Sequence, residues 1–168
     1  MKDHKYWIES LKLEKHREGG FASQTYESPL RITDREIKST FEGTRPLSTS
    51  IYFLIHDNNV SNFHRLKADE MWYFHEGISL NIAIISPEGE LSEFKLGRDV
   101  ENGEQLQVLV PSGSIFGAYM QDGKGYSLVG CMVSFGFDFK DFELFNRADL
   151  IKEYPAYRDL ILKLTTDR

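Results

Sequence analysis

Several features are scarce in this chain of 168 residues, and each shortage excludes a class of protein. The chain has one cysteine, Cys131, which excludes an internal disulfide framework and a metal site built from several thiolates. No run of apolar residues approaches the roughly 18 that a membrane-spanning helix needs. No basic start followed by an apolar stretch marks a signal peptide. We therefore expect a cytoplasmic protein that does not insert into a membrane.

An excess of positive charge is also missing. Lys and Arg number 20 against 26 Asp and Glu, which gives a formal net charge of −6 at pH 7. The largest basic patch is "HRLK", so we expect neither a nucleic acid nor an anionic membrane surface as a partner. The length suits a single domain, residues 1–168, which can bury about 70% of the surface of its unfolded chain.

From about residue 22 to 140 the sequence contains a series of short β-type runs. Apolar or alternating stretches such as "STSIYFLIH", "SLNIAIIS" and "QLQVLVPSG" are separated by turn sequences such as "DNN", "SPEGE" and "QDGKG". Many short strands without helices between them are typical of a sandwich, a barrel or a jelly roll. The sequence therefore predicts an all-β fold.

Helical patterns flank this region at both ends. An apolar stripe with helical spacing begins at Trp7 and a glycine pair follows it, which predicts a helix over about 4–18. A second stripe begins at Tyr157, and Asn146 offers an N-cap before it, which predicts a helical segment over about 147–165.

The stretch "SNFHRLKADEMWYFHEG", residues 61–77, carries the polar side chains that suggest a site. In a strand, alternation places Glu70, Trp72 and Phe74 on one face. A carboxylate next to two aromatic rings needs a polar partner, because burial otherwise destabilises its charge. His64 is the candidate partner, either as a base that the carboxyl group orients or as half of a structural hydrogen-bonded pair.

This stretch resembles the first metal-binding motif of the cupins. The spacing from His64 to Glu70 to Gly77 follows that motif, but Leu66 stands where it has a second histidine. The segment "PSGSIF" resembles the second cupin motif, with Phe116 in place of the last histidine ligand. We therefore expect no metal and no other cofactor; if a divalent metal did bind, His64 and Glu70 would be its ligands.

The chain as a whole is similar to the cupin family DUF985 (Cupin_5). The segments "GGFASQTYES", "STSIYFLI", "VPSG", "YSLVGCMVSFGFDFKDFEL" and "LIKEYP" occur in the order found in that family. The resemblance implies a double-stranded β-helix (an RmlC-like cupin jelly roll) with short N- and C-terminal helices. It also implies a homodimer and a ligand pocket inside the barrel. Phe63 and Phe116 stand where tryptophan is frequent in the family, which implies a different pocket shape.

Given this resemblance, the expected pocket residues are polar and aromatic side chains from several strands. His64 is the candidate catalytic base, Glu70 is its partner, and Tyr119 is a candidate acid that no motif supports. The other four histidines gain no role from their spacing. The aromatic side chains also fit a plain hydrophobic core. The residues expected to contact a ligand are Ser61, His64, Glu70, Trp72, Phe74, Phe116, Tyr26 and Arg31.

Three functions stay open, and each has a small molecule as the partner. The first is metal-independent binding of a small polar metabolite, of a sugar or nucleotide type, with isomerisation or epimerisation that uses His64 as the base. The second is a metal-dependent oxygenase or decarboxylase. The third is a ligand-binding module without catalysis.

Overall fold

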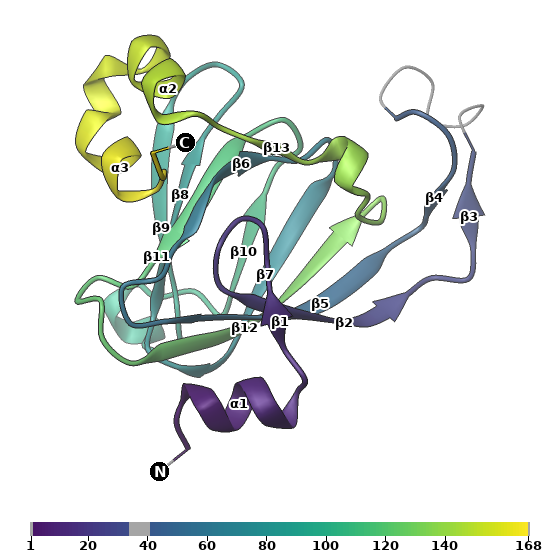
Figure 1. Ribbon diagram of the computed structural model, residues 1–168, viewed down its shortest axis with the longest axis horizontal. Coiled ribbons are helices and arrows are strands. Elements are labelled where there is room, and N and C mark those ends of the chain that lie inside the picture. Colours follow the sequence, from purple (N-terminus) through teal and green to yellow (C-terminus); the bar gives the residue numbers. More distant parts are fainter. Residues whose placement is uncertain (1, 34–40, 168) are drawn as a thin grey trace.

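The computed structural model describes residues 2–33 and 41–167, and its fold is built mainly from antiparallel strands (Figure 1). The strands are β1 (Glu14–Lys15), β2 (Phe21–Glu27), β3 (Arg31–Ile32), β4 (Arg45–Pro46), β5 (Thr49–His56), β6 (Ser61–Arg65), β7 (Asp69–Gly77), β8 (Leu80–Ile85), β9 (Leu91–Leu96), β10 (Gln107–Val110), β11 (Ile115–Tyr119), β12 (Tyr126–Ser134) and β13 (Glu143–Leu144).

These strands form two main sheets. The first sheet has six strands in the order β1-β2-β5-β12-β7-β10, and the second has five in the order β13-β6-β11-β8-β9. The short strands β3 and β4 pair with each other. Apart from the consecutive pairs β1–β2 and β8–β9, strands adjacent in each sheet are not consecutive in the sequence, which is the connectivity of a jelly roll. The predicted all-β jelly roll is therefore confirmed.

The main core lies between the two sheets. It includes Phe53, Trp72 and Val129 from the first sheet and Ile82 and Phe116 from the second. On β7 the side chains alternate as a strand requires: Trp72 is buried, whereas its neighbours on either side are only partly buried. The same alternation turns polar residues of β6 and β7 toward the interior.

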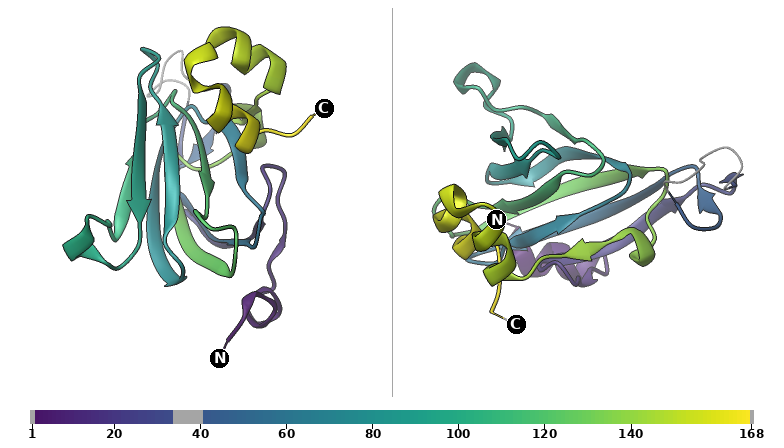
Figure 2. Two further views of the ribbon diagram at one scale, coloured as in Figure 1. Left: turned by 90° about the vertical axis from the view of Figure 1, so that its left-hand side faces the viewer. Right: turned by 90° about the horizontal axis from the view of Figure 1, so that it is seen from above.

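The α-helices are short and lie at the ends of the chain: α1 (His4–Ser10), α2 (Arg147–Glu153) and α3 (Arg158–Lys163). Three short 3-10 helices occur elsewhere or beside them: η1 (Val100–Asn102), η2 (Phe139–Asp141) and η3 (Pro155–Tyr157). Helix α1 packs on the outer face of the first sheet, against Leu54 and Leu128. Helices α2 and α3 cover the outer face of the second sheet through Leu150, Ile161 and Leu164 (Figure 2).

The predicted N-terminal helix is too long. It ends at Ser10, and the chain is already extended in β1 at Glu14. The glycine pair makes the turn from β1 to β2 instead of ending a helix. Gly19 has a φ of 108°, and a Cβ there would collide with the Val60 carbonyl oxygen. Antiparallel pairing in the first sheet thus overrides the helical spacing near the N-terminus.

The C-terminal helical segment is divided. The Asn146 side chain accepts hydrogen bonds from the backbone at the start of α2, as the sequence predicts. The segment then breaks at Pro155, which lacks the N–H that a continuous helix would use.

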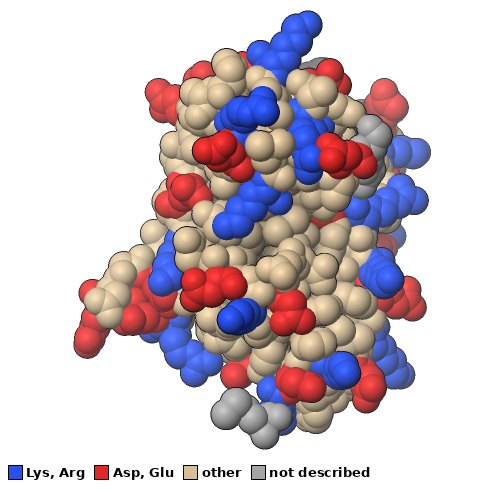
Figure 3. Space-filling view, turned by 60° about the vertical axis from the view of Figure 1, so that its left-hand side comes forward, with Lys and Arg blue, Asp and Glu red and all other residues tan. Residues whose placement is uncertain are grey.

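The surface carries both signs of charge. On the face shown in Figure 3, acidic and basic side chains are intermingled. None of the helices in the described part of the chain is long and apolar enough to cross a lipid bilayer.

Candidate functional site

A cavity of about 250 Å³ lies inside the barrel, between the two sheets. Strands β5, β7 and β12 of the first sheet and β6 of the second contribute to its walls. The turn from β1 to β2 and the segment after β12 close it. The described residues that line it are Glu14, Lys15, His16, Glu18, Ala22, Ser23, Gln24, Thr49, Ile51, His64, Leu66, Glu70, Cys131, Val133, Phe137 and Phe139.

His64 and Glu70 both line this cavity, one from each sheet. Both are buried, with 2% and 6% of their surface exposed. However, they are not partners. The His64 Nε2 atom lies 3.2 Å from Oε2 of Glu18, and its Nδ1 donates to the Asn62 carbonyl oxygen at 2.7 Å. The predicted pairing of His64 with Glu70 is therefore wrong.

Glu18 is surrounded by donors. Ser61 donates its hydroxyl hydrogen to Glu18 Oε1 at 2.8 Å, and His16 Nδ1 lies 3.4 Å from Glu18 Oε2. Burial opposes ionisation of Glu18, but the charges and hydrogen bonds of His64, His16 and Ser61 outweigh it and lower the pKa of this carboxyl group. Glu18 is therefore a buried carboxylate at neutral pH.

Contacts with the protein occupy both ring nitrogens of His64. Nδ1 faces the Asn62 carbonyl oxygen and Nε2 faces the Glu18 carboxyl group. Neither nitrogen is free to take a proton from a ligand, and the geometry therefore argues against His64 as the base.

The pKa of Glu70 is shifted in the opposite direction from that of Glu18. Burial, and next the charge of Glu18, raise the pKa of Glu70 to about 8. The carboxyl group is therefore protonated at neutral pH. Its Oε2 makes no hydrogen bond to any described residue. The Trp72 indole and the Cys131 thiol lie close enough to favour the ionised form, but the Trp72 Nε1 also lacks a hydrogen-bond partner among the described residues.

The aromatic residues predicted for the site lie behind its polar groups. The Phe116 ring is 4.1 Å from the His64 ring, centroid to centroid, and Trp72 packs edge-on against Phe116 at 6.4 Å. Trp72 and Phe116 are 1% exposed. Phe74 packs against the core near the guanidinium of Arg98. None of the three rings is among the described residues that line the cavity.

Three predicted site residues lie elsewhere. Tyr26 is 50% exposed, and Arg31 forms an exposed ion pair with Glu27. Tyr119 lies on the other side of the second sheet, beneath the C-terminal helices. Its hydroxyl donates to Glu93 at 2.9 Å, and burial together with Glu93 raises the pKa of Tyr119 to about 12. None of the three residues lines the cavity of this chain. The geometry therefore contradicts an acid role of Tyr119 in the cavity, whereas contact of Tyr26 and Arg31 with a ligand, at the pocket of a second subunit, stays a prediction.

With the geometry established, the chain can be compared with known proteins. A model of the family "Cupin superfamily (DUF985)" matches residues 5–145. The chain belongs to the DUF985 family of the cupin superfamily.

Solved structures and a curated relative agree with this membership. Protein SO0799 from Shewanella oneidensis is 48% identical, with a TM-score of 0.89, and the match covers 100% of both chains. A hypothetical protein from Leishmania major is 35% identical, with a TM-score of 0.88, over 99% of this chain and 100% of that one. The uncharacterized protein YML079W from Saccharomyces cerevisiae is 29% identical over 86% of this chain and 76% of its own length.

A more distant likeness shows the fold alone. Oxalate decarboxylase from Bacillus subtilis matches with a TM-score of 0.54 and 15% identity, over 92% of this chain and 37% of that one. This match confirms the cupin jelly roll and carries no information about activity here.

Sequence reasoning missed His16 and Glu18, which this DUF985 cupin places at the centre of its site. A signal was present: Glu14, His16 and Glu18 alternate with period 2, and all three line the cavity. This period is that of an extended chain and not of a helix. The apolar stripe with helical spacing that precedes these residues led to the prediction of a helix over about 4–18, so the alternation of these three side chains was not recognised.

The cavity residues of this cupin do not fit a bound metal ion. Leu66 lines the cavity at one position where the cupin motif has a ligand, and the Phe116 ring packs on His64 at another. Both nitrogens of His64 are engaged. In the described part of the chain, one group of His, Cys, Asp or Glu residues has its potential metal-ligand atoms within 4.8 Å of one another. This group lies outside the cavity.

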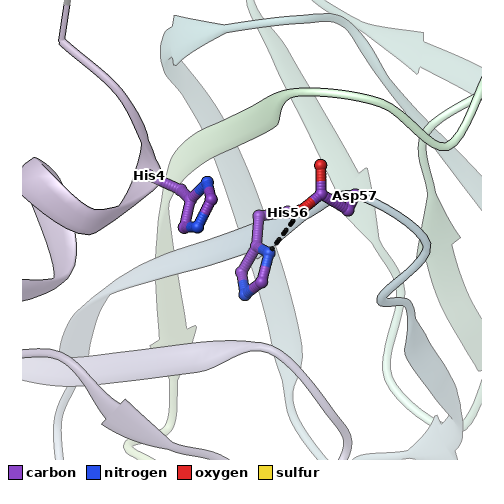
Figure 4. A group of neighbouring side chains, drawn as sticks. All are labelled: His4, His56 and Asp57. Carbon is purple, nitrogen blue, oxygen red and sulfur yellow. Dashed lines mark hydrogen bonds and ion pairs between the residues drawn. The ribbon is translucent and has the colours of Figure 1, made fainter.

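That outer group consists of His4, His56 and Asp57, where α1 meets the end of β5 (Figure 4). The two imidazole rings stack, with centroids 4.2 Å apart and planes 5° from parallel. His56 Nδ1 bonds Asp57 at 3.1 Å, and Asn59 bonds its Nε2 at 3.2 Å. Stacked rings direct their lone pairs along parallel planes and not toward a common point. The group therefore helps to hold α1 on the barrel and is not arranged as a tetrahedral metal site.

Proposed function

We propose that this protein binds a small polar metabolite in the barrel cavity and transfers protons on it without a metal, as isomerases and epimerases do. The size of the cavity supports a small ligand. Its volume of about 250 Å³ is below the roughly 300 to 1,000 Å³ of pockets for drug-sized ligands. A compound the size of a monosaccharide fits this volume, and a complete nucleotide-sugar does not.

One observation carries the proposal. Two buried carboxyl groups face the same cavity in opposite protonation states. Glu18 is held as a carboxylate by Ser61, His64 and His16, and Glu70 is held as a neutral acid by burial. Titratable groups whose environments move their pKa values apart are the usual sign of an acid and base working together.

A non-catalytic binding module is the second candidate. It is favoured by Glu70 Oε2, a buried atom at the cavity wall that has no hydrogen-bond partner in the described part of the chain, because such an atom is costly unless a ligand or water bonds it. Both candidates require a ligand in the cavity. They differ in whether the ligand is changed.

The test is mass spectrometry under non-denaturing conditions of the protein purified without chelators or ligand exchange. We expect a bound compound of monosaccharide size, which Glu70→Gln weakens and Tyr119→Phe, outside the cavity, leaves in place. The bound compound is then released and incubated with fresh protein in D2O. Incorporation of deuterium supports proton transfer, and binding without incorporation would leave only the binding module. Protein without any bound compound, and without a thermal shift across a metabolite panel, would refute the proposal.

A further inference from the structure

Building on the proposed function, we infer that Glu18 is the base and Glu70 the acid in the enolisation of a small neutral α-hydroxycarbonyl compound, an aldose or a ketose. The inference assigns the reacting groups and the class of substrate. It rests on which cavity atoms are already bonded, which are free, and which charges line the walls.

Glu18 is better placed than His64 to receive a proton. The side chain of Glu18 is 10% exposed and that of His64 is 2% exposed, so the carboxylate is the more accessible member of the pair. The His64 ring is also enclosed by Phe116 and Phe142, at centroid distances of 4.1 and 5.2 Å. His64 thus acts as a positioning residue, which holds Glu18 ionised and oriented.

The backbone fixes Glu18 as well. The Asn62 backbone N–H and the Asn62 side-chain amide both donate to the Glu18 carbonyl oxygen at 2.7 Å. Gly19 allows this approach, because a side chain there would collide with Val60. A carboxylate held both at its backbone and at its side chain is preorganised, which is what a base needs.

Glu70 has the properties of the acid. Its carboxyl group is buried at the cavity wall, and its Oε2 has no hydrogen-bond partner among the described residues. A neutral carboxyl group can donate its proton to the carbonyl oxygen of a ligand, where negative charge develops during enolisation. The Trp72 indole N–H also lacks a partner in the described part of the chain, but its ring is not among the residues that line the cavity.

The step balances without a cofactor. A Glu18 oxygen removes, as a proton, the hydrogen on the carbon next to the carbonyl, and the C–H electron pair forms a C=C bond. The carbonyl π pair moves to its oxygen, which takes the proton of Glu70. The product is an enediol, with Glu18 protonated and Glu70 ionised. Glu18 then returns its proton to the former carbonyl carbon, and the other hydroxyl returns a proton to Glu70, which converts an aldose into a ketose.

The wall charges indicate a neutral substrate. Among the described lining residues, Lys15 is the one Lys or Arg, and it lies exposed at the rim. Glu14, Glu18 and Glu70 contribute carboxyl groups to the same walls. Phosphate groups are usually bound by Arg, Lys or helix N-termini, and the exposed Lys15 is the one Lys or Arg among the described lining residues. A free sugar therefore fits better than a sugar phosphate or a nucleotide-sugar.

The test is proton NMR in D2O with a panel of neutral aldoses and ketoses from trioses to hexoses, and with their phosphates for comparison. We expect the native protein to exchange, for deuterium from the solvent, the hydrogen on the carbon next to the carbonyl group of at least one neutral sugar in the panel. Glu18→Gln and Glu70→Gln should each slow this exchange by about 100-fold or more, as loss of an acid or a base does. Tyr119→Phe is the matched control and should retain the native rate. The rate should also fall as pH rises through about 8, because the Glu70 acid then ionises.

Circular dichroism establishes that each variant folds, and Glu18→Asp provides a second, less disruptive change at the base. It should reduce exchange while the fold is retained. Exchange that survives Glu18→Gln but is lost in His64→Gln would show that His64 is the base. If the protein exchanges hydrogen only in the sugar phosphates, the proposal of a neutral sugar as the substrate is refuted.

The same experiments distinguish an error in the assigned chemistry or substrate class from an absence of ligand binding. Sugars that bind, by saturation-transfer NMR, without exchange would refute the assigned chemistry and leave binding intact. If no sugar in the panel binds, but the purified protein carries another bound compound, then the substrate class is wrong and the binding function stands. If neither is found, both fail.

Discussion

Glu70→Gln is expected to make this protein more stable, by an amount that grows with pH. Burial and the charge of Glu18 raise the pKa of Glu70 from the ordinary 4.5 to about 8 in the folded protein. Between these values the folded chain holds a proton that the unfolded chain has released. Stability therefore falls as pH rises through this range, because the unfolded state binds fewer protons than the folded state.

The size of the effect follows from the same values. Each unit of pKa difference corresponds to about 1.4 kcal/mol. At pH 7, about 2.5 units above the ordinary pKa, the ionisation of Glu70 in the unfolded chain lowers the free energy of unfolding by roughly 3 kcal/mol. Glutamine has nearly the same shape and does not ionise, so Glu70→Gln removes this pH-dependent loss. Any cost of burying its amide is the same at every pH.

The assay is urea unfolding, followed by tryptophan fluorescence, of the native protein and of Glu70→Gln across the range from pH 4.5 to pH 8. The difference in free energy of unfolding between the two proteins should increase by roughly 3 kcal/mol from pH 4.5 to pH 7. Glu143→Gln, at an exposed carboxylate of β13, is the matched control and should show no such trend. A difference for Glu70→Gln that stays constant with pH would show that Glu70 is ionised in the fold and would refute the reasoning.

Three further predictions concern single side chains. His64→Ala leaves the Glu18 carboxylate buried without the ring that contacts it at 3.2 Å; we expect a loss of about 3 to 5 kcal/mol in urea unfolding, which adding Glu18→Gln should partly restore. Asp141→Asn breaks the buried two-bond contact that Arg45 makes at 2.7 and 3.0 Å, and a similar loss of about 3 to 5 kcal/mol is expected; a change below about 1 kcal/mol would contradict it. Tyr119→Phe should cost about 1 kcal/mol and leave ligand-induced thermal shifts unchanged; weaker binding would place this ring in the site.

The sequence was sufficient for the strands and for the inward direction of Glu70 and Trp72, because period-2 alternation acts locally. Alternation also argues against Tyr119 as a site residue. It lies three positions after Phe116 on β11, and an odd separation places it on the opposite face of the strand. The family resemblance, and not the pattern, had suggested a tyrosine acid.

The partner of His64 could not be predicted from the sequence. Glu18 reaches it only because β1 turns into β2 and brings a loop over the barrel opening, and that pairing depends on the first sheet as a whole. Local spacing offered Glu70 as the nearer candidate. The homodimer and the cytoplasmic location stay predictions.

The physical consequence of the altered cupin motif is a change in how buried charge is balanced. Two carboxyl groups in one enclosed cavity repel each other, and without a bound cation at most one can stay ionised at moderate cost. Here His64 contacts Glu18 and helps to lower the pKa of that carboxyl group, and Glu70 avoids a second charge by keeping its proton. The hydrocarbon of Leu66 and Phe116 strengthens both effects, because it excludes water from the same walls. Apolar side chains at two ligand positions of the cupin motif therefore leave one carboxylate and one carboxylic acid lining the same cavity. This is the arrangement that the proposed proton transfer requires.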